Sequence, residues 1–210
     1  MKASLTGHLV LSTLHTIDAP SAIGRLADIG VDLGALSGSL KGVIAQRLVR
    51  KLCESCCQPV TLEELPEDQR HLLAGRKTEK LRRSTGCEAC RNTGFRGRMV
   101  VPEVLLVSDE MRSAIARGAD RVELQDHAKR AGMVPLWESG LRRVIDGSTS
   151  LPELLDNINP PLAHEKFEQG DVESALARMR GESANPVSPA PSDPATMIGN
   201  GAGHPVQAPI

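Results

Sequence analysis

The sequence has 210 residues and a formal net charge of −1, so the whole chain has no field that would attract it to nucleic acid or to an anionic membrane. Apolar residues make up 40% of it, but the aromatic residues are only Trp137, Phe95 and Phe167. The core is therefore expected to consist of Leu, Val, Ile and Ala, which favours helices over an aromatic-rich sandwich. No apolar stretch approaches the roughly 18 residues of a membrane-spanning helix, and no signal peptide is recognised, so a cytoplasmic location is predicted.

The N-terminal part of the chain is predicted to contain a strand and two helices. Residues 7–14 form a short apolar run that is typical of a buried strand. Asp18 is expected to cap a helix that has Pro20 in its first turn and ends at Gly30. Apolar residues then recur at helical spacing, which predicts a second helix over residues 36–52.

The five cysteines fall into two clusters. Cys53 and Cys56 form one C-x-x-C pair, and Cys87 and Cys90 form another thirty residues later. Zinc binds four soft ligands at the corners of a tetrahedron, and a two-residue spacer lets one tight turn present two thiolates. The alternative is a set of ordinary buried cysteines, but the double pair favours a closed structural zinc site. Cys57 is the surplus thiol. The two-residue spacer after Cys53 favours Cys56, and not Cys57, as the ligand.

The segment between the cysteine pairs, residues 58–84, is polar and charged and is interpreted as an insertion. In it Thr61 and Glu64 occupy capping-box positions ahead of a short helix. After the second pair, residues 98–107 are rich in valine and leucine, which predicts one or two short strands.

The rest of the chain is predicted to be a helical subdomain followed by a tail. Helices are predicted over residues 108–115, 122–131 and 136–145. Ser150 and Glu153 form a second capping box before a last helix. Residues 172–179 have a short amphipathic pattern. Residues 182–210 hold six of the 14 prolines and few bulky apolar groups, so a disordered tail is expected there.

Two histidines bracket the first apolar run. His8 begins it, and His15 ends it between threonines. In a parallel strand His15 would lie at the carboxyl end, the edge where open α/β sheets bind ligands. A pair of hydrogen-bonded histidines around a core strand explains the same positions, and position alone favours this second interpretation.

Several specific segments, in one order, resemble the C-terminal part of the type II secretion and type IV pilus assembly ATPases. They are TGHLVLSTLHTIDAPSAIGRLADIGV, GVIAQRLVRKLC, the cysteine pairs, GCEACRNTGFRGR and GSTSLPELL. The resemblance implies a RecA-like hexameric motor that uses ATP and Mg²⁺. It implies that His8 and His15 form a histidine box near the nucleotide phosphates. Gln46 and Arg47 match the AQRL segment and are expected near the nucleotide, without a definite role.

The same resemblance assigns the four paired cysteines to the zinc-binding tetracysteine motif of the assembly ATPases. Retraction ATPases lack this motif, so an assembly or secretion member is indicated. The expected partners are other copies or an N-terminal half in a hexameric ring, and proteins of the inner-membrane secretion platform. Through such partners the chain would be peripheral to the membrane.

Hydrolysis of ATP needs a phosphate-binding loop, and the pattern G-x-x-x-x-G-K-[ST] does not occur in the sequence. The expectation is a motor fragment that is inert alone, from a truncated, split or decayed gene. The expected fold class is α/β, the C-terminal part of a RecA-like core with a zinc-knuckle insertion and a helical subdomain. Its expected divisions are residues 1–52, 53–98, 99–159 and a tail over 160–210.

Two other functions are compatible with the zinc pattern. Between Lys77 and Arg98 seven basic residues accompany only Glu79 and Glu88, so a zinc-ribbon module could bind nucleic acid. Only Phe95 offers a stacking surface, and a solvated rim around the zinc site explains the basic residues better, so nucleic acid is not the expected partner. A stand-alone adaptor that binds secretion components is the third interpretation.

Overall fold

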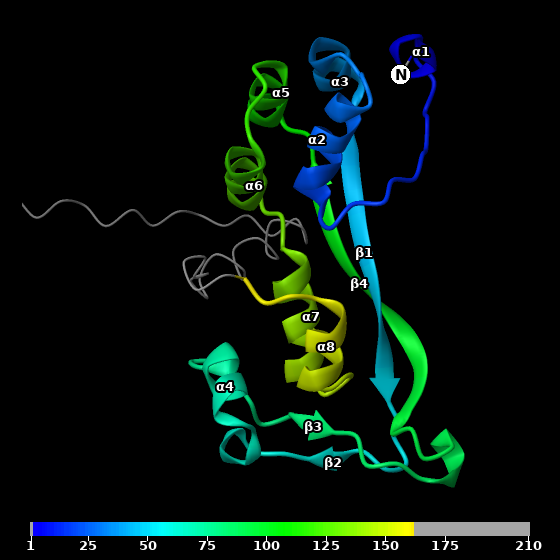
Figure 1. Cartoon of the computed structure of the whole chain (residues 1–210), viewed down its shortest axis with the longest axis vertical. Helices are drawn as coiled ribbons and strands as arrows, with labels where there is room; N and C mark the ends of the chain where they lie inside the picture. The colour runs from blue at the N-terminus through cyan, green and yellow to red at the C-terminus, as the bar shows by residue number, and fades with distance from the viewer. Residues whose placement is uncertain (1, 162–210) are drawn as a thin grey trace, which may run out of the picture.

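The computed structural model describes residues 2–161, which form a mixed α/β structure (Figure 1). The strands are β1 (Gly42–Leu52), β2 (Gln58–Pro59), β3 (Arg82–Arg83) and β4 (Phe95–Leu106). The α-helices are α1 (Lys2–Leu5), α2 (Ala19–Asp28), α3 (Leu33–Ser39), α4 (Glu67–Arg70), α5 (Asp109–Ala116), α6 (Arg121–Arg130), α7 (Leu136–Ile145) and α8 (Leu151–Asn157). Short 3₁₀ turns are η1 (Leu62–Glu64), η2 (His71–Leu73) and η3 (Glu88–Cys90). The patterns predicted over residues 172–179 and 182–210 lie outside the described residues.

The centre of the fold is a long antiparallel ribbon of β1 and β4. Along each strand side chains alternate between two faces. On the inner face Val49, Val101 and Leu105 are buried, and α2, α7 and α8 pack against this ribbon. On the outer face Ile44 is 68% exposed and Leu48 is 54% exposed. The described part of the chain therefore covers only one face of its main sheet.

The core continues from the ribbon into the helices. Buried residues on α3, α5, α6, α7 and α8 join the inner-face side chains in one apolar cluster. Leu36 of α3, Met111 of α5 and Leu141 of α7 are all essentially inaccessible to solvent. The expectation of a core built from aliphatic residues is confirmed, since Trp137 is the only aromatic side chain in that cluster.

Local capping signals fix where the helices begin. Asp18 accepts a hydrogen bond from the Ser21 amide at 2.8 Å at the start of α2. Ser108 accepts one from the Met111 amide at the start of α5. Side-chain oxygens at these positions satisfy amides that have no partner inside the helix. The helices predicted in residues 108–158 are confirmed, with ends that differ by one or two residues.

The second capping box is only half formed. Ser150 caps α8 by accepting from the Glu153 amide at 3.4 Å. The Glu153 carboxylate does not return to Ser150; it accepts instead from the Arg50 amide at 2.8 Å and from the Arg50 side chain. In the insertion, Glu64 accepts from the Thr61 amide at 2.8 Å, as its capping box predicted, although the helix that follows is a 3₁₀ turn.

Two predicted elements are wrong. Residues 36–52 are not one helix: α3 ends at Ser39, and residues 42–52 form β1. A strand explains Gly42, where a β-carbon would lie 2.9 Å from the carbonyl oxygen of Leu105 on β4. Residues 7–14 are extended but form no strand, because no described strand pairs with them. The prediction of one or two short strands over residues 98–107 is confirmed as one strand, β4, which begins earlier, at Phe95, and has 12 residues.

Candidate metal centre and histidine segment

The ribbon brings the two cysteine pairs together. Cys53 follows the last residue of β1, and the second pair precedes the first residue of β4. Because Leu52 pairs with Phe95 in an antiparallel register, both turns lie at the same end of the ribbon. The Cys53 amide then donates to the Gly94 carbonyl at 2.9 Å, which joins the first turn to the second.

The four paired cysteines form one compact cluster. The sulfur atoms of Cys53 and Cys87 are 4.0 Å apart, and those of Cys56 and Cys90 are 3.9 Å apart. All four sulfurs lie within 4.8 Å of one another. A tetrahedron with metal–sulfur bonds of about 2.3 Å has edges of about 3.8 Å. The cluster could therefore hold a metal ion with four sulfur ligands.

Backbone amides in the second turn point at one of these sulfurs. The amides of Cys87 and Gly94 each donate to Cys90 Sγ at 3.2 Å. Burial opposes ionisation of this thiol, but hydrogen bonds from the two amides and from the neighbouring thiols of Cys87 and Cys56 lower the pKa of Cys90 to about 6. A backbone hydrogen bond with Cys90 acts to lower the pKa of the adjacent Cys87, but burial and hydrogen bonds with the other thiols outweigh it and raise that pKa to about 11. Metal binding requires thiolates, so of the two cysteines in this turn only Cys90 is shifted toward the form that binds a metal.

The second turn depends on left-handed backbone. Arg91 and Asn92 have φ of 55° and 60°, and Gly94 has φ of 76°. A β-carbon at Gly94 would lie 2.5 Å from Cβ of Ser84. Glycine is therefore required at position 94 both by its positive φ and by the lack of space beside Ser84.

Cys57 lies outside the metal cluster. Its half-exposed sulfur accepts from Arg82 Nη1 at 3.2 Å and lies 4.0 Å from the Glu54 carbonyl oxygen. The structure thus places Cys56, and not Cys57, beside the other three cysteines.

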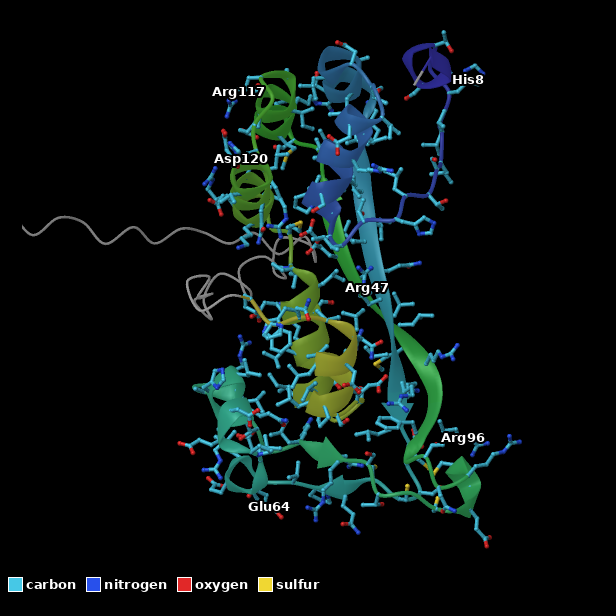
Figure 2. The ribbon with its side chains drawn as sticks, in the orientation of Figure 1. His8, Arg47, Glu64, Arg96, Arg117 and Asp120 are labelled. Atoms are coloured by element: carbon cyan, nitrogen blue, oxygen red, sulfur yellow. The ribbon has the colours of Figure 1, made fainter. Side chains whose placement is uncertain are left out.

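The histidines predicted as a box do not share a described contact. His8 is exposed, and its Nδ1 lies 3.2 Å from Thr6 Oγ1 near α1. Figure 2 shows His8 at the end of the molecule, well above Arg47. His15 is also exposed and belongs to the extended segment. This histidine segment, residues 8–17, also carries Leu9 and Leu11, which are 82% and 87% exposed.

The two AQRL residues face opposite sides of the ribbon. Gln46 is exposed on the outer face opposite Pro102. Arg47 is half-buried, and its Nη2 donates to the carbonyl oxygens of Thr16 at 3.3 Å and Ile17 at 3.0 Å. Arg47 therefore contacts the end of the histidine segment directly.

Sequence reasoning missed Glu103, which organises the residues after that segment. Its side chain on β4 is buried, and its two oxygens accept from the Ala19 amide at 2.6 Å and the Leu136 amide at 3.0 Å. One carboxylate thus satisfies the first amides of both α2 and α7. A glutamate within a valine-rich strand was the only signal in the sequence that could have found it.

Comparisons with known proteins give a consistent result. Residues 1–156 match the family described as Type II/IV secretion system protein. The chain is 41% identical over 165 residues to the type IV pilus assembly ATPase PilB of Myxococcus xanthus, covering 76% of this chain and 29% of that protein. It is 44% identical over 157 residues to the PilB of Thermus thermophilus, covering 73% and 17%. It is 43% identical over 157 residues to the type II secretion system ATPase E of Vibrio cholerae, covering 74% and 30%.

The chain therefore spans less than a third of the length of these relatives. Within residues 2–161, no helix is both long enough and apolar enough to cross a membrane.

Proposed function

The chain belongs to the type II/IV secretion system protein family, and we propose that it acts as the histidine- and zinc-bearing part of a secretion or pilus assembly ATPase. The observation that carries this proposal is the similarity of three quarters of the chain to proteins named as such ATPases. The motor would couple ATP hydrolysis, with Mg²⁺, to protein secretion or pilus polymerisation. His8 and His15 would contribute the histidine box, and Gln46 and Arg47 would lie near the nucleotide.

On this proposal the phosphate-binding part of the motor would come from other residues. The 210 residues contain no G-x-x-x-x-G-K-[ST], so no group here can cradle the β- and γ-phosphates in the usual way. The exposed apolar side chains of the ribbon's outer face and of the histidine segment support association with further protein, since such surface is usually covered. We propose that residues 1–52 complete a RecA-like core in this way.

The four clustered cysteines are proposed to hold one structural zinc ion. The sulfur separations fit tetrahedral coordination, and four thiolates leave no position for a catalytic water. Zinc would fix the two turns at the end of the ribbon and so define a subdomain over residues 53–98. Residues 99–159 would then form the helical subdomain, although β4 begins within the zinc segment and shares the ribbon with β1.

The partners would be other copies in a hexameric ring and proteins of an inner-membrane platform, which would keep the chain cytoplasmic and peripheral to the membrane. A zinc-ribbon adaptor or a nucleic-acid-binding module is the alternative. The nucleic-acid alternative is less well supported, because the Arg50 guanidinium lies 4.2 Å from the ring centroid of Phe95 and covers one face of that ring.

The test is a measurement of ATP hydrolysis by two proteins. The chain alone is expected to show no hydrolysis above background, and a fusion that places the upstream half of a family member before Met1 is expected to hydrolyse ATP. His15→Ala should abolish most turnover of the fusion, whereas His71→Ala, an exposed histidine of the insertion, should not. Steady hydrolysis by the chain alone that is sensitive to His15→Ala would refute the proposed division of roles.

A further inference from the structure

The residues directly after His15 are held by side chains from three separate elements. Arg47 of β1 donates to the carbonyl oxygens of Thr16 and Ile17. Arg121 at the start of α6 pairs with the Asp18 carboxylate at 2.7 Å. Glu103 of β4 accepts from the Ala19 amide. These four consecutive residues, 16–19, are called the corner below. Its fixed position contrasts with residues 8–15 of the histidine segment, which precede it and are exposed.

Among these three contacts, that of Arg47 lies nearest to His15 and serves no helix cap. Asp18 and Glu103 satisfy amides at the N-terminus of α2, so they act on the helix. Arg47 instead binds carbonyl oxygens on the histidine side of that helix. We infer that Arg47 is a positioning residue for His15, which it holds through the backbone of Thr16 and Ile17. This inference rests on the proposed function insofar as His15 acts in hydrolysis.

The geometry of the guanidinium distinguishes positioning from phosphate binding. Nη1 donates to the Gln46 carbonyl at 3.0 Å while Nη2 donates to Thr16 and Ile17. All three acceptors are backbone carbonyls, and within residues 2–161 no carboxylate pairs with Arg47. Both terminal nitrogens are thus engaged in fixing local backbone. A planar fork with several donors can hold two successive carbonyls, whereas a lysine ammonium offers one compact charge.

The first test uses the zinc-loaded 210-residue chain and does not depend on catalysis. NMR of ¹³C-labelled histidine side chains is recorded for the chain and for Arg47→Ala, with His15 assigned by His15→Gln. In Arg47→Ala the His15 signal is expected to move to the position that it has in a free peptide of residues 8–17. The His71 and His127 signals of the same variant should stay where they are in the unchanged chain. Arg47→Lys should give an intermediate position, and Arg98→Ala, an exposed arginine of β4, should change nothing at His15. An unmoved His15 signal in Arg47→Ala would overturn the inference.

The second test uses the hydrolysing fusion. Loss of positioning should lower kcat by about 10- to 100-fold with KM for ATP changed less than about twofold. The double variant Arg47→Ala, His15→Ala should be no slower than His15→Ala alone, because both changes remove one function. A raised KM together with additive losses would instead identify Arg47 as a nucleotide ligand and overturn the inference. If His15→Ala retains full turnover, the proposed function fails, and the NMR result still decides whether Arg47 positions His15.

Discussion

Replacing Glu103 by glutamine should weaken the junction between α2 and α7. The carboxylate accepts two amide hydrogens, at 2.6 and 3.0 Å, with one on each oxygen. A glutamine keeps one oxygen, and its NH₂ group would face the second amide, so that one hydrogen bond is lost and two donors oppose each other in a buried site. Hydrogen bonds to charged groups contribute about 1.5–3 kcal/mol each, and an unpaired buried donor costs about 1–3 kcal/mol. The expected loss is about 2–4 kcal/mol, which is smaller than the sum of the two terms because the site can relax.

Denaturant and thermal unfolding of the metal-loaded chain measure this loss. For a chain of this size 2–4 kcal/mol corresponds to a fall in Tm of about 5–15 °C. Glu79→Gln is the matched control, because Glu79 is exposed and makes no described contact. A Glu103→Gln protein that unfolds within about 0.5 kcal/mol of the control would refute the assignment of Glu103 as a shared cap, since surface substitutions fall in that range.

The pH dependence of stability tests the same carboxyl group. Burial, the largest influence, raises the pKa of Glu103 above its ordinary 4.5 although the Ala19 and Leu136 amides act to lower it. The folded state then binds the Glu103 proton more tightly than the unfolded state does. Stability contributed by Glu103 is therefore largest below pH 4.5 and is lost as pH rises through the folded pKa. The difference in unfolding free energy between the chain and Glu103→Gln should therefore become smaller as pH rises from 4.5 through the folded pKa. A difference that grows with pH would contradict a raised pKa for Glu103.

Two further predictions concern the metal cluster. Cys90→Ser should lose zinc, measured by elemental analysis, and should unfold at a lower temperature than the unchanged chain. Cys57→Ser should keep near-stoichiometric zinc. Zinc retained in a Cys53→Ser, Cys90→Ser double variant would contradict the assignment of these cysteines as ligands. Gly94→Ala should weaken zinc binding in a chelator competition, because its β-carbon would lie 2.5 Å from Ser84 and its φ is 76°, while Gly38→Ala, where the added carbon meets nothing within 4 Å, should bind normally.

The features that the sequence predicted well are those with local signals. Three helices begin after a capping residue that the sequence indicated: Asp18, Ser108 and Ser150. Each places a side-chain oxygen before an apolar helical pattern, and such a cap acts over only three residues. The cysteine spacing is equally local, since each pair forms one turn. What brought the two turns together was not local: the register that opposes Leu52 to Phe95 spans the whole insertion.

Long-range polar contacts left no pattern that could be recognised in advance. Glu103 meets amides that lie 84 and 33 residues away, and Arg50 meets Glu153 at a separation of 103 residues. Glu153 was assigned to a capping box because its spacing from Ser150 permits one. Its contacts with the half-exposed Arg50 determined the actual orientation of the buried Glu153 carboxylate, because a charge-assisted pair with several donors outweighs a single bond to a backbone amide.

The misassigned helix over residues 36–52 shows why spacing alone misled. Leu40, Val43, Ile44 and Leu48 share one face of a helix, whereas Val43, Ala45 and Val49 share one face of a strand. The apolar residues of this segment therefore fit both the helical period of 3.6 and the strand period of 2. A partner decides between them. Val43 faces Leu105 and Val49 faces Met99 across the ribbon, at sequence separations of 62 and 50 residues. The strand also leaves Ile44 and Leu48 on the exposed face, which a helix packed on a sheet would have buried. Spacing within residues 36–52 could not decide the assignment, because the pairing with β4 that makes residues 42–52 a strand lies outside that segment.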